Sequence, residues 1–269
     1  MKLKFVCAVL TVCLFAGAMF IDGNSQTHDT HENKTYTVLA SCFPVYALTE
    51  AVIGDVPGLS VQMLTLPRQE GYSEYELSDW ENAYAGSADI FVCLGNGFES
   101  FDRSILNEDC IIITLLADEE LLKTEPLISS NHPQDATFPY INYIYLSVDG
   151  SRKLLSKLSE AFISVDPQYE EIYEVNTKRA AERIERIEYR AIPFSHKIAI
   201  EPAFAYMINE AGISAESVLF ADEEMTLPDD TVDMRGKLNA MLDMDSSFTF
   251  ENYVNAFREN YSLLYEAVK

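Results

Sequence analysis

The stretch Ala88–Phe98, ADIFVCLGNGF, is the part of the sequence that decides the fold. Its first half is a short apolar run, and its second half is a Gly-Asn-Gly turn that ends the run. A second apolar run, CIIITLL, follows at Cys110–Leu116. Unbroken apolar runs of this length are typical of strands buried on both faces, as in parallel sheets covered by helices. We therefore predict an α/β protein built on a parallel sheet.

Strand and helix patterns alternate along the chain on both sides of this stretch. Further strands are expected at Tyr36–Ala40, Leu59–Leu66, Lys197–Ile200 and Ser217–Phe220. Helical patterns are expected at Val45–Ile53, Ser78–Gly86, Phe98–Leu106, Ser151–Ile163, Phe204–Ala211, Asp229–Leu242 and Glu251–Val268. From Pro167 to about Arg190 the sequence is dense in charge and contains no further Gly or Pro, which predicts one long helix. The fold class expected is α/β, with two Rossmann-like lobes of parallel sheet joined by this helix.

These patterns also predict how the chain is divided. The expected parts are a signal peptide at 1–18, a flexible leader at 19–35, an N-terminal α/β lobe at 36–166, a long linking helix at 167–191, and a shortened C-terminal α/β lobe at 192–269.

The first residues have the pattern of an export signal. Lys2 and Lys4 precede an apolar run from Phe5 to Phe15, and Ala16-Gly17-Ala18 supplies the small residues of a cleavage site before Met19. An uncleaved anchor is the alternative, although the apolar stretch is at the short limit of what spans a bilayer. We expect an exported protein in the cell envelope, at the periplasmic or extracellular face of the membrane.

The charge balance limits the partners. The formal net charge is −24, which argues against nucleic acid and anionic membrane surfaces and is compatible with a cationic ligand. An acidic surface that only keeps an exported protein soluble is the simpler interpretation. After cleavage the cysteines are Cys42, Cys93 and Cys110, an odd number without the spacing of a disulfide framework or a CxxC motif.

The sequence carries no recognised catalytic signature. GxSxG, HExxH and P-loop motifs are missing, and no Cys has a matched His. We therefore predict that the protein is not an enzyme, and a secreted hydrolase is the least favoured of the functions considered.

Several segments, in order, resemble the metal-binding solute-binding proteins of zinc and manganese ABC importers. The matching segments are Val38–Gly54, Pro67–Ser78, Ala88–Phe98, Tyr145–Ser147 with Asp166-Pro167 beyond it, and Ile198–Tyr206. Together they cover most of residues 36–212. The resemblance implies two α/β lobes joined by one rigid helix, with a metal held between the lobes, usually by three His and one carboxylate.

The resemblance also implies which residues would bind the metal. Ser73 and Tyr143 stand where the family has its first two His, Glu201 stands at the third position, and Asp243 matches the carboxylate before the last helix. Zinc prefers His nitrogen and Cys thiolate, whereas two carboxylates and two hydroxyls suit a harder cation such as Mn²⁺, Mg²⁺ or Ca²⁺, or no metal at all.

The function implied is that of an extracytoplasmic solute-binding component of a metal ABC importer. The protein would bind a divalent cation, zinc or manganese, between its lobes and deliver it to the membrane permease. We expect a monomer. The alternative is a divergent family member that has lost its metal site and binds another small ligand or an envelope partner.

Overall fold

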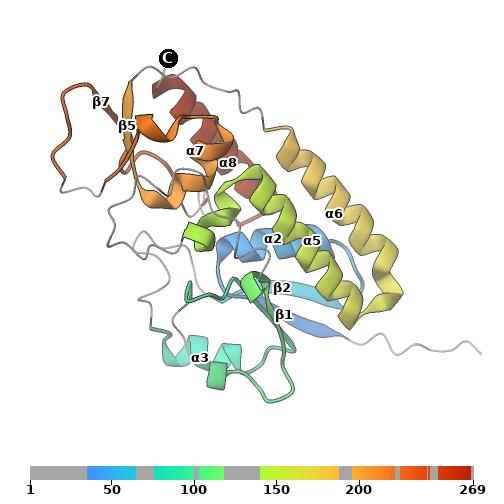
Figure 1. Ribbon diagram of the computed structural model, residues 1–269. Coiled ribbons are helices and arrows are strands. Elements are labelled where there is room, and N and C mark those ends of the chain that lie inside the picture. The colour runs from blue at the N-terminus through green and yellow to red at the C-terminus, as the bar shows by residue number, and fades with distance from the viewer. Residues whose placement is uncertain are drawn as a thin grey trace, which may run out of the picture. The chain divides into compact units, whose positions relative to one another are not determined.

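The computed structural model describes residues 35–64, 76–99, 103–117, 140–187, 196–221, 225–240, 242 and 248–267 (Figure 1). The predicted signal peptide and leader, Ser73 and Asp243 lie outside the described residues. All elements named below belong to one unit, residues 35–269.

The first sheet contains four parallel strands in the order β2-β1-β3-β4. These are β1 (Tyr36–Ala40), β2 (Leu59–Met63), β3 (Ile90–Cys93) and β4 (Ile111–Thr114). In register, Val38 of β1 pairs with Val61 of β2 on one side and with Ile90 of β3 on the other. The strand predictions at β1, β2 and β3 are therefore confirmed, although β2 ends at Met63 and Leu64 lies outside it.

Both faces of this sheet are buried at the central strand β3, as its apolar run predicts. Successive side chains of a strand point to opposite faces, and in β3 Ile90 and Val92 join the main core while Phe91 and Cys93 join a second, smaller core. Helix α2 (Phe43–Ile53) packs on the main-core side. Helix α3 (Asp79–Ala85) contributes Ala85 to the smaller core and begins with a capping box made by Ser78 and Glu81.

Two expectations for the end of this region are wrong. Strand β4 is an edge strand, and its Ile111 and Ile112 are each 38% exposed, so the second apolar run is not buried on both faces. The described part of the helix expected at Phe98–Leu106 is only a 3₁₀ turn, η1 (Arg103–Ile105).

Two long helices lie side by side and pack against α2 (Figure 1). They are α5 (Val148–Val165) and α6 (Glu170–Glu185), connected by the 3₁₀ turn η5 (Pro167–Tyr169). Helix α6 contains most of the described part of the long helix predicted from Pro167. It buries Tyr173, Ala180 and Ile184, and an ion pair of 2.7 Å joins Arg152 of α5 to Glu185 of α6.

The second sheet contains three parallel strands in the order β6-β5-β7. They are β5 (Lys197–Ile200), β6 (Val218–Phe220) and β7 (Thr231–Asp233), accompanied by α7 (Ala205–Glu210) and α8 (Phe250–Ala267). The helix predicted at Asp229–Leu242 is wrong, because Thr231–Asp233 instead pairs in parallel with Lys197–Ala199 of β5. The fold is thus α/β with two parallel sheets, as predicted.

A search of the described helices for a membrane-spanning segment finds none with the necessary length and apolar character.

Candidate functional site

Each sheet has one place where ligands are expected from topology alone. In open α/β sheets, ligands bind beyond the carboxyl ends of the strands, where the chain turns to opposite sides from two neighbouring strands. In the first sheet this switch point lies between β1 and β3, and in the second it lies between β5 and β7. A glutamate stands at each of these two points.

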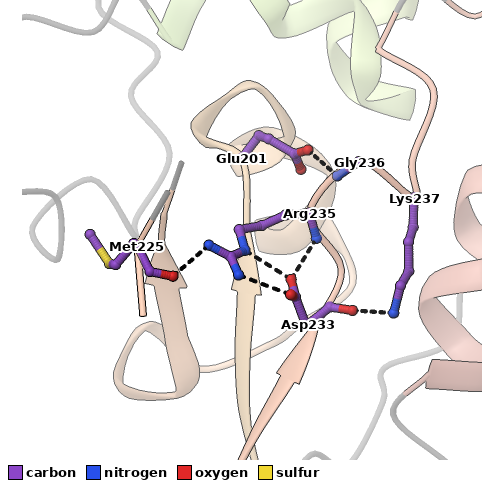
Figure 2. A network of polar contacts seen from close by, with 6 residues as sticks. All are labelled: Glu201, Met225, Asp233, Arg235, Gly236 and Lys237. Atoms are coloured by element: carbon purple, nitrogen blue, oxygen red, sulfur yellow. Dashed lines mark hydrogen bonds and ion pairs between the residues drawn. The ribbon is translucent and has the colours of Figure 1, made fainter. Parts of the chain in front are cut away.

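The glutamate of the second sheet is Glu201, which directly follows β5. Its backbone is extended, and Pro202 begins the next 3₁₀ turn, η6 (Pro202–Phe204). One carboxylate oxygen, Oε1, accepts a hydrogen bond from the backbone N–H of Gly236, just beyond β7 (Figure 2). Gly236 has φ of 68°, in the left-handed region that suits glycine.

The other oxygen of Glu201 is the most informative atom of the site. Oε2 is buried and finds no hydrogen-bond partner among the described residues. Leaving a buried polar group unsatisfied costs about 1–3 kcal/mol, more when it is charged, so native proteins rarely do so without a reason. A bound cation would supply the missing interaction.

Beside Glu201, Asp233 and Arg235 form a two-point ion pair (Figure 2). Nε and Nη2 of Arg235 donate to Oδ1 and Oδ2 of Asp233, both at 2.9 Å, and the backbone N–H of Arg235 adds a bond of 3.1 Å. Nη1 of Arg235 donates to the carbonyl of Met225 at 2.8 Å. The hydrogen bonds from Arg235 lower the pKa of Asp233 to about 2, so this carboxylate is ionised and forms an ion pair with Arg235.

Glu99, the glutamate of the first sheet, differs from Glu201 because both of its carboxylate oxygens accept hydrogen bonds. Its Oε1 accepts hydrogen bonds from Ser41 Oγ at 2.6 Å and from the N–H of Leu94 at 2.8 Å. Its Oε2 accepts from the N–H of Gly95 at 2.8 Å. Burial raises the pKa of Glu99, against the opposing effect of these hydrogen bonds. Through its three hydrogen bonds, Glu99 connects Ser41, just beyond β1, with Leu94 and Gly95, just beyond β3.

Tyr143 lies on a kinked 3₁₀ segment, η4 (Tyr140–Leu146), that is held to the first sheet. Its ring packs edge-on against Phe98, with ring centroids 5.9 Å apart. The preceding residue, Asn142, exchanges two hydrogen bonds with Asn96 of the Gly-Asn-Gly turn, at 2.9 and 3.3 Å. Burial raises the pKa of Tyr143, so its hydroxyl is neutral near pH 7 and a weak metal ligand.

The same 3₁₀ segment also contacts the second sheet's elements. It packs against η6 and α7, and Tyr145 donates from its hydroxyl to the carbonyl of Ala240 at 2.9 Å. Tyr143 thus lies on a segment that contacts η6, the turn that directly follows Glu201. Of the four predicted metal positions, these two lie within the described residues. Within those residues, no group of three or more His, Cys, Asp and Glu side chains is arranged to hold a metal.

The residues around Glu201 were not found from the sequence. Asp233, Arg235 and Gly236 fall in the segment that was predicted to be a helix. A signal was present: Thr231-Val232 is β-favouring, Pro228-Asp229-Asp230 is turn-favouring, and Gly236 is unfavourable inside a helix.

Two parallel sheets with polar groups gathered at their switch points define an α/β binding protein. The family model described as ZnuA, zinc-uptake complex component A, periplasmic, matches residues 38–239. The chain therefore belongs to the ZnuA family of periplasmic solute-binding proteins. A search of curated proteins finds no match.

Solved structures share the fold at low sequence identity. FpvC from Pseudomonas aeruginosa in complex with Mn²⁺ is 14% identical, with 87% of this chain and 98% of that chain covered and a TM-score of 0.64. A structure of ZnuA is 15% identical, with 88% and 100% covered and a TM-score of 0.65. The Zn(II)-bound ZnuA-like domain of Streptococcus pneumoniae AdcA is 17% identical, with 87% and 99% covered and a TM-score of 0.63.

Proposed function

We propose that this protein is the extracytoplasmic solute-binding component of a metal ABC importer. It binds a divalent cation between its two lobes and delivers the cation to a membrane permease. The observation that carries the proposal is the buried Oε2 of Glu201, which has no hydrogen-bond donor in the described part of the chain. The family supports the class of function, since its members are periplasmic components of zinc-uptake complexes.

Glu201 is the principal donor in this proposal. Its Oε1 is fixed by Gly236, so Oε2 is already oriented before the cation arrives. Tyr143 is the second donor, as a neutral hydroxyl, and Ser73 and Asp243 complete the proposed set. A set made only of oxygens favours Mn²⁺ over Zn²⁺, because zinc prefers nitrogen and sulfur ligands. The function is binding and transport, without catalysis.

Calorimetric titration of the purified, metal-stripped protein with Mn²⁺ and Zn²⁺ tests this proposal. We expect one saturable site, and we expect Glu201→Ala to weaken it by at least about 100-fold, because the substitution removes a direct ligand. Glu216→Gln is the matched control: it removes one negative charge from an exposed position of the same lobe and should leave the affinity unchanged.

One observation favours a second candidate, a family member that has lost its metal site. Within the described residues no cluster of three metal-ligating side chains is found. Weak binding at many sites, equal in Glu201→Ala and in the unmodified protein, would reflect only the acidic surface. That result would reject the metal-binding proposal and support another small ligand or an envelope partner.

A further inference from the structure

An arginine stands next to the carboxylate that the proposed function assigns to the cation. Ala199 of β5 is level with Asp233 of β7 in the sheet register. Glu201 and Arg235 each lie two residues further along, so the chain places them at the same edge of the sheet. The contact between Glu201 and Gly236, the neighbour of Arg235, confirms this closeness (Figure 2).

The arginine would be a strong competitor for this carboxylate. A guanidinium matches a carboxylate with two parallel hydrogen bonds and carries a permanent positive charge. Oε2 of Glu201 is buried and, within the described residues, has no donor. The side chain of Arg235 is only 11% exposed, so water screens its charge poorly.

The guanidinium of Arg235 instead binds Asp233 and Met225. Nε and Nη2 are both bound by the carboxylate of Asp233, and Nη1 is bound by the carbonyl of Met225. Figure 2 shows the guanidinium group turned towards these two residues, whereas the Glu201 carboxylate points to Gly236. Asp233 is itself 44% exposed, so its position is not dictated by burial.

We infer that Asp233 is a positioning residue that holds Arg235 away from Glu201 and so keeps Glu201 available to a cationic ligand. The inference rests on the proposed function in one respect, that Glu201 receives a cation. In the absence of Asp233, Arg235 turns to Glu201 and becomes an internal competitor of the incoming metal. Asp233 acts only through Arg235 and does not touch the metal.

A double-substitution cycle tests this, with Mn²⁺ as the probe. Asp233→Asn should weaken Mn²⁺ binding about tenfold or more, a change of about 1.4 kcal/mol, because the amide no longer neutralises the guanidinium. Arg235→Gln alone should bind Mn²⁺ at least as tightly as the unmodified protein. The double variant, Asp233→Asn with Arg235→Gln, should recover the affinity of Arg235→Gln. A purely structural role of Asp233 would not be rescued by removing Arg235.

The opposite results overturn the inference. These are an unchanged affinity in Asp233→Asn, a double variant as weak as Asp233→Asn, or, if Asp233→Asn does not fold, a loss of more than about tenfold in Arg235→Gln.

A crystal structure of metal-free Asp233→Asn separates this inference from the proposed function. Contact between the guanidinium of Arg235 and the carboxylate of Glu201 supports the inference, even if the unmodified protein binds no Mn²⁺ and the proposed function fails. An Arg235 that stays beside residue 233 or turns to solvent overturns it.

Discussion

The switch points of the two sheets use the same residue type in two different ways. In the first sheet, Glu99 joins the ends of β1 and β3 and receives hydrogen bonds from Ser41, Leu94 and Gly95. In the second sheet, Glu201 joins the ends of β5 and β7 through one bond from Gly236. Oε2 of Glu201 is buried without a donor among the residues that the structure describes.

The difference separates a structural carboxylate from the carboxylate that we propose binds the cation. A carboxylate whose two oxygens are both occupied stabilises the fold and has little capacity left for a ligand. A carboxylate with one oxygen fixed and the other buried and unsatisfied costs stability until a ligand arrives. Sequence alone does not distinguish the two glutamates, since both follow a strand within a few residues.

The largest effect expected from this comparison is on stability, in Glu99→Gln. The amide nitrogen would face a backbone N–H, of Leu94 or Gly95, and leave a buried donor without an acceptor. We expect the free energy of unfolding to fall by about 1–3 kcal/mol. Urea unfolding of the metal-free protein measures it.

Glu201→Gln is the matched control for this experiment. Its amide oxygen can still accept from Gly236, and its amide nitrogen replaces an oxygen that has no donor within the described residues, so no existing hydrogen bond is lost. It should therefore destabilise the metal-free protein less than Glu99→Gln does. Equal losses in the two variants would contradict the division into a structural and a binding carboxylate.

The sequence predicted the centre of each sheet well and the edges poorly. Tyr36–Ala40 and Lys197–Ile200 are strands with the bounds expected, because central strands need apolar side chains on both faces. The run at Ile111–Thr114 is also strongly apolar but lies at an edge. Composition shows that a segment favours a strand, whereas its place in the sheet depends on distant pairing.

The prediction of a helix at Asp229–Leu242 failed for a related reason. Met234, Leu238 and Leu242 recur at helical spacing and are all buried. The segment reaches the core without forming a helix, because Gly236 and Leu242 have positive φ and Thr231–Asp233 pairs with β5. Tertiary pairing overrides local periodicity here.

Glu201 and Tyr143 were both assigned to the metal from the resemblance. Only Glu201 could also be placed by an expected strand, Lys197–Ile200, which it directly follows. The roles of Asp233, Arg235 and Gly236 depend on the parallel register between β5 and β7, which pairs residues more than thirty positions apart. Ser73 and Asp243 remain predictions, since they lie outside the described residues.

A smaller effect is expected from Tyr143→Phe. Burial raises the pKa of Tyr143, so the hydroxyl would bind a metal as a neutral group and contribute less than the carboxyl group of Glu201. We expect Mn²⁺ affinity to fall by less than about tenfold, or about 1.4 kcal/mol. Calorimetric titration measures the change.

Stability serves as the control for Tyr143→Phe. The ring keeps its contact with Phe98, so the fold should be retained, and the urea unfolding midpoint of the metal-free variant measures any stability lost with the hydroxyl. A loss of affinity as large as that of Glu201→Ala would make Tyr143 an equal ligand and would require its hydroxyl to ionise on binding.

The smallest expected effect is the pH dependence of the Glu99→Gln cost. Burial raises the pKa of Glu99 in the folded state above the ordinary value of a glutamate carboxyl. The folded state therefore holds this proton more tightly than the unfolded state does, and the contribution of Glu99 to stability declines as pH rises from the unfolded pKa through the folded one. A glutamine has no such proton. The substitution should therefore cost more at about pH 4 than at about pH 8.

Glu216→Gln is the control, and its effect on the free energy of unfolding is measured at both pH values. It removes a carboxyl group from the surface. It therefore corrects for the general repulsion within a chain of net charge −24. A cost that instead grows towards pH 8 would mean that the hydrogen bonds from Ser41, Leu94 and Gly95 outweigh burial. Glu99 would then be held as a carboxylate more firmly than its surroundings imply.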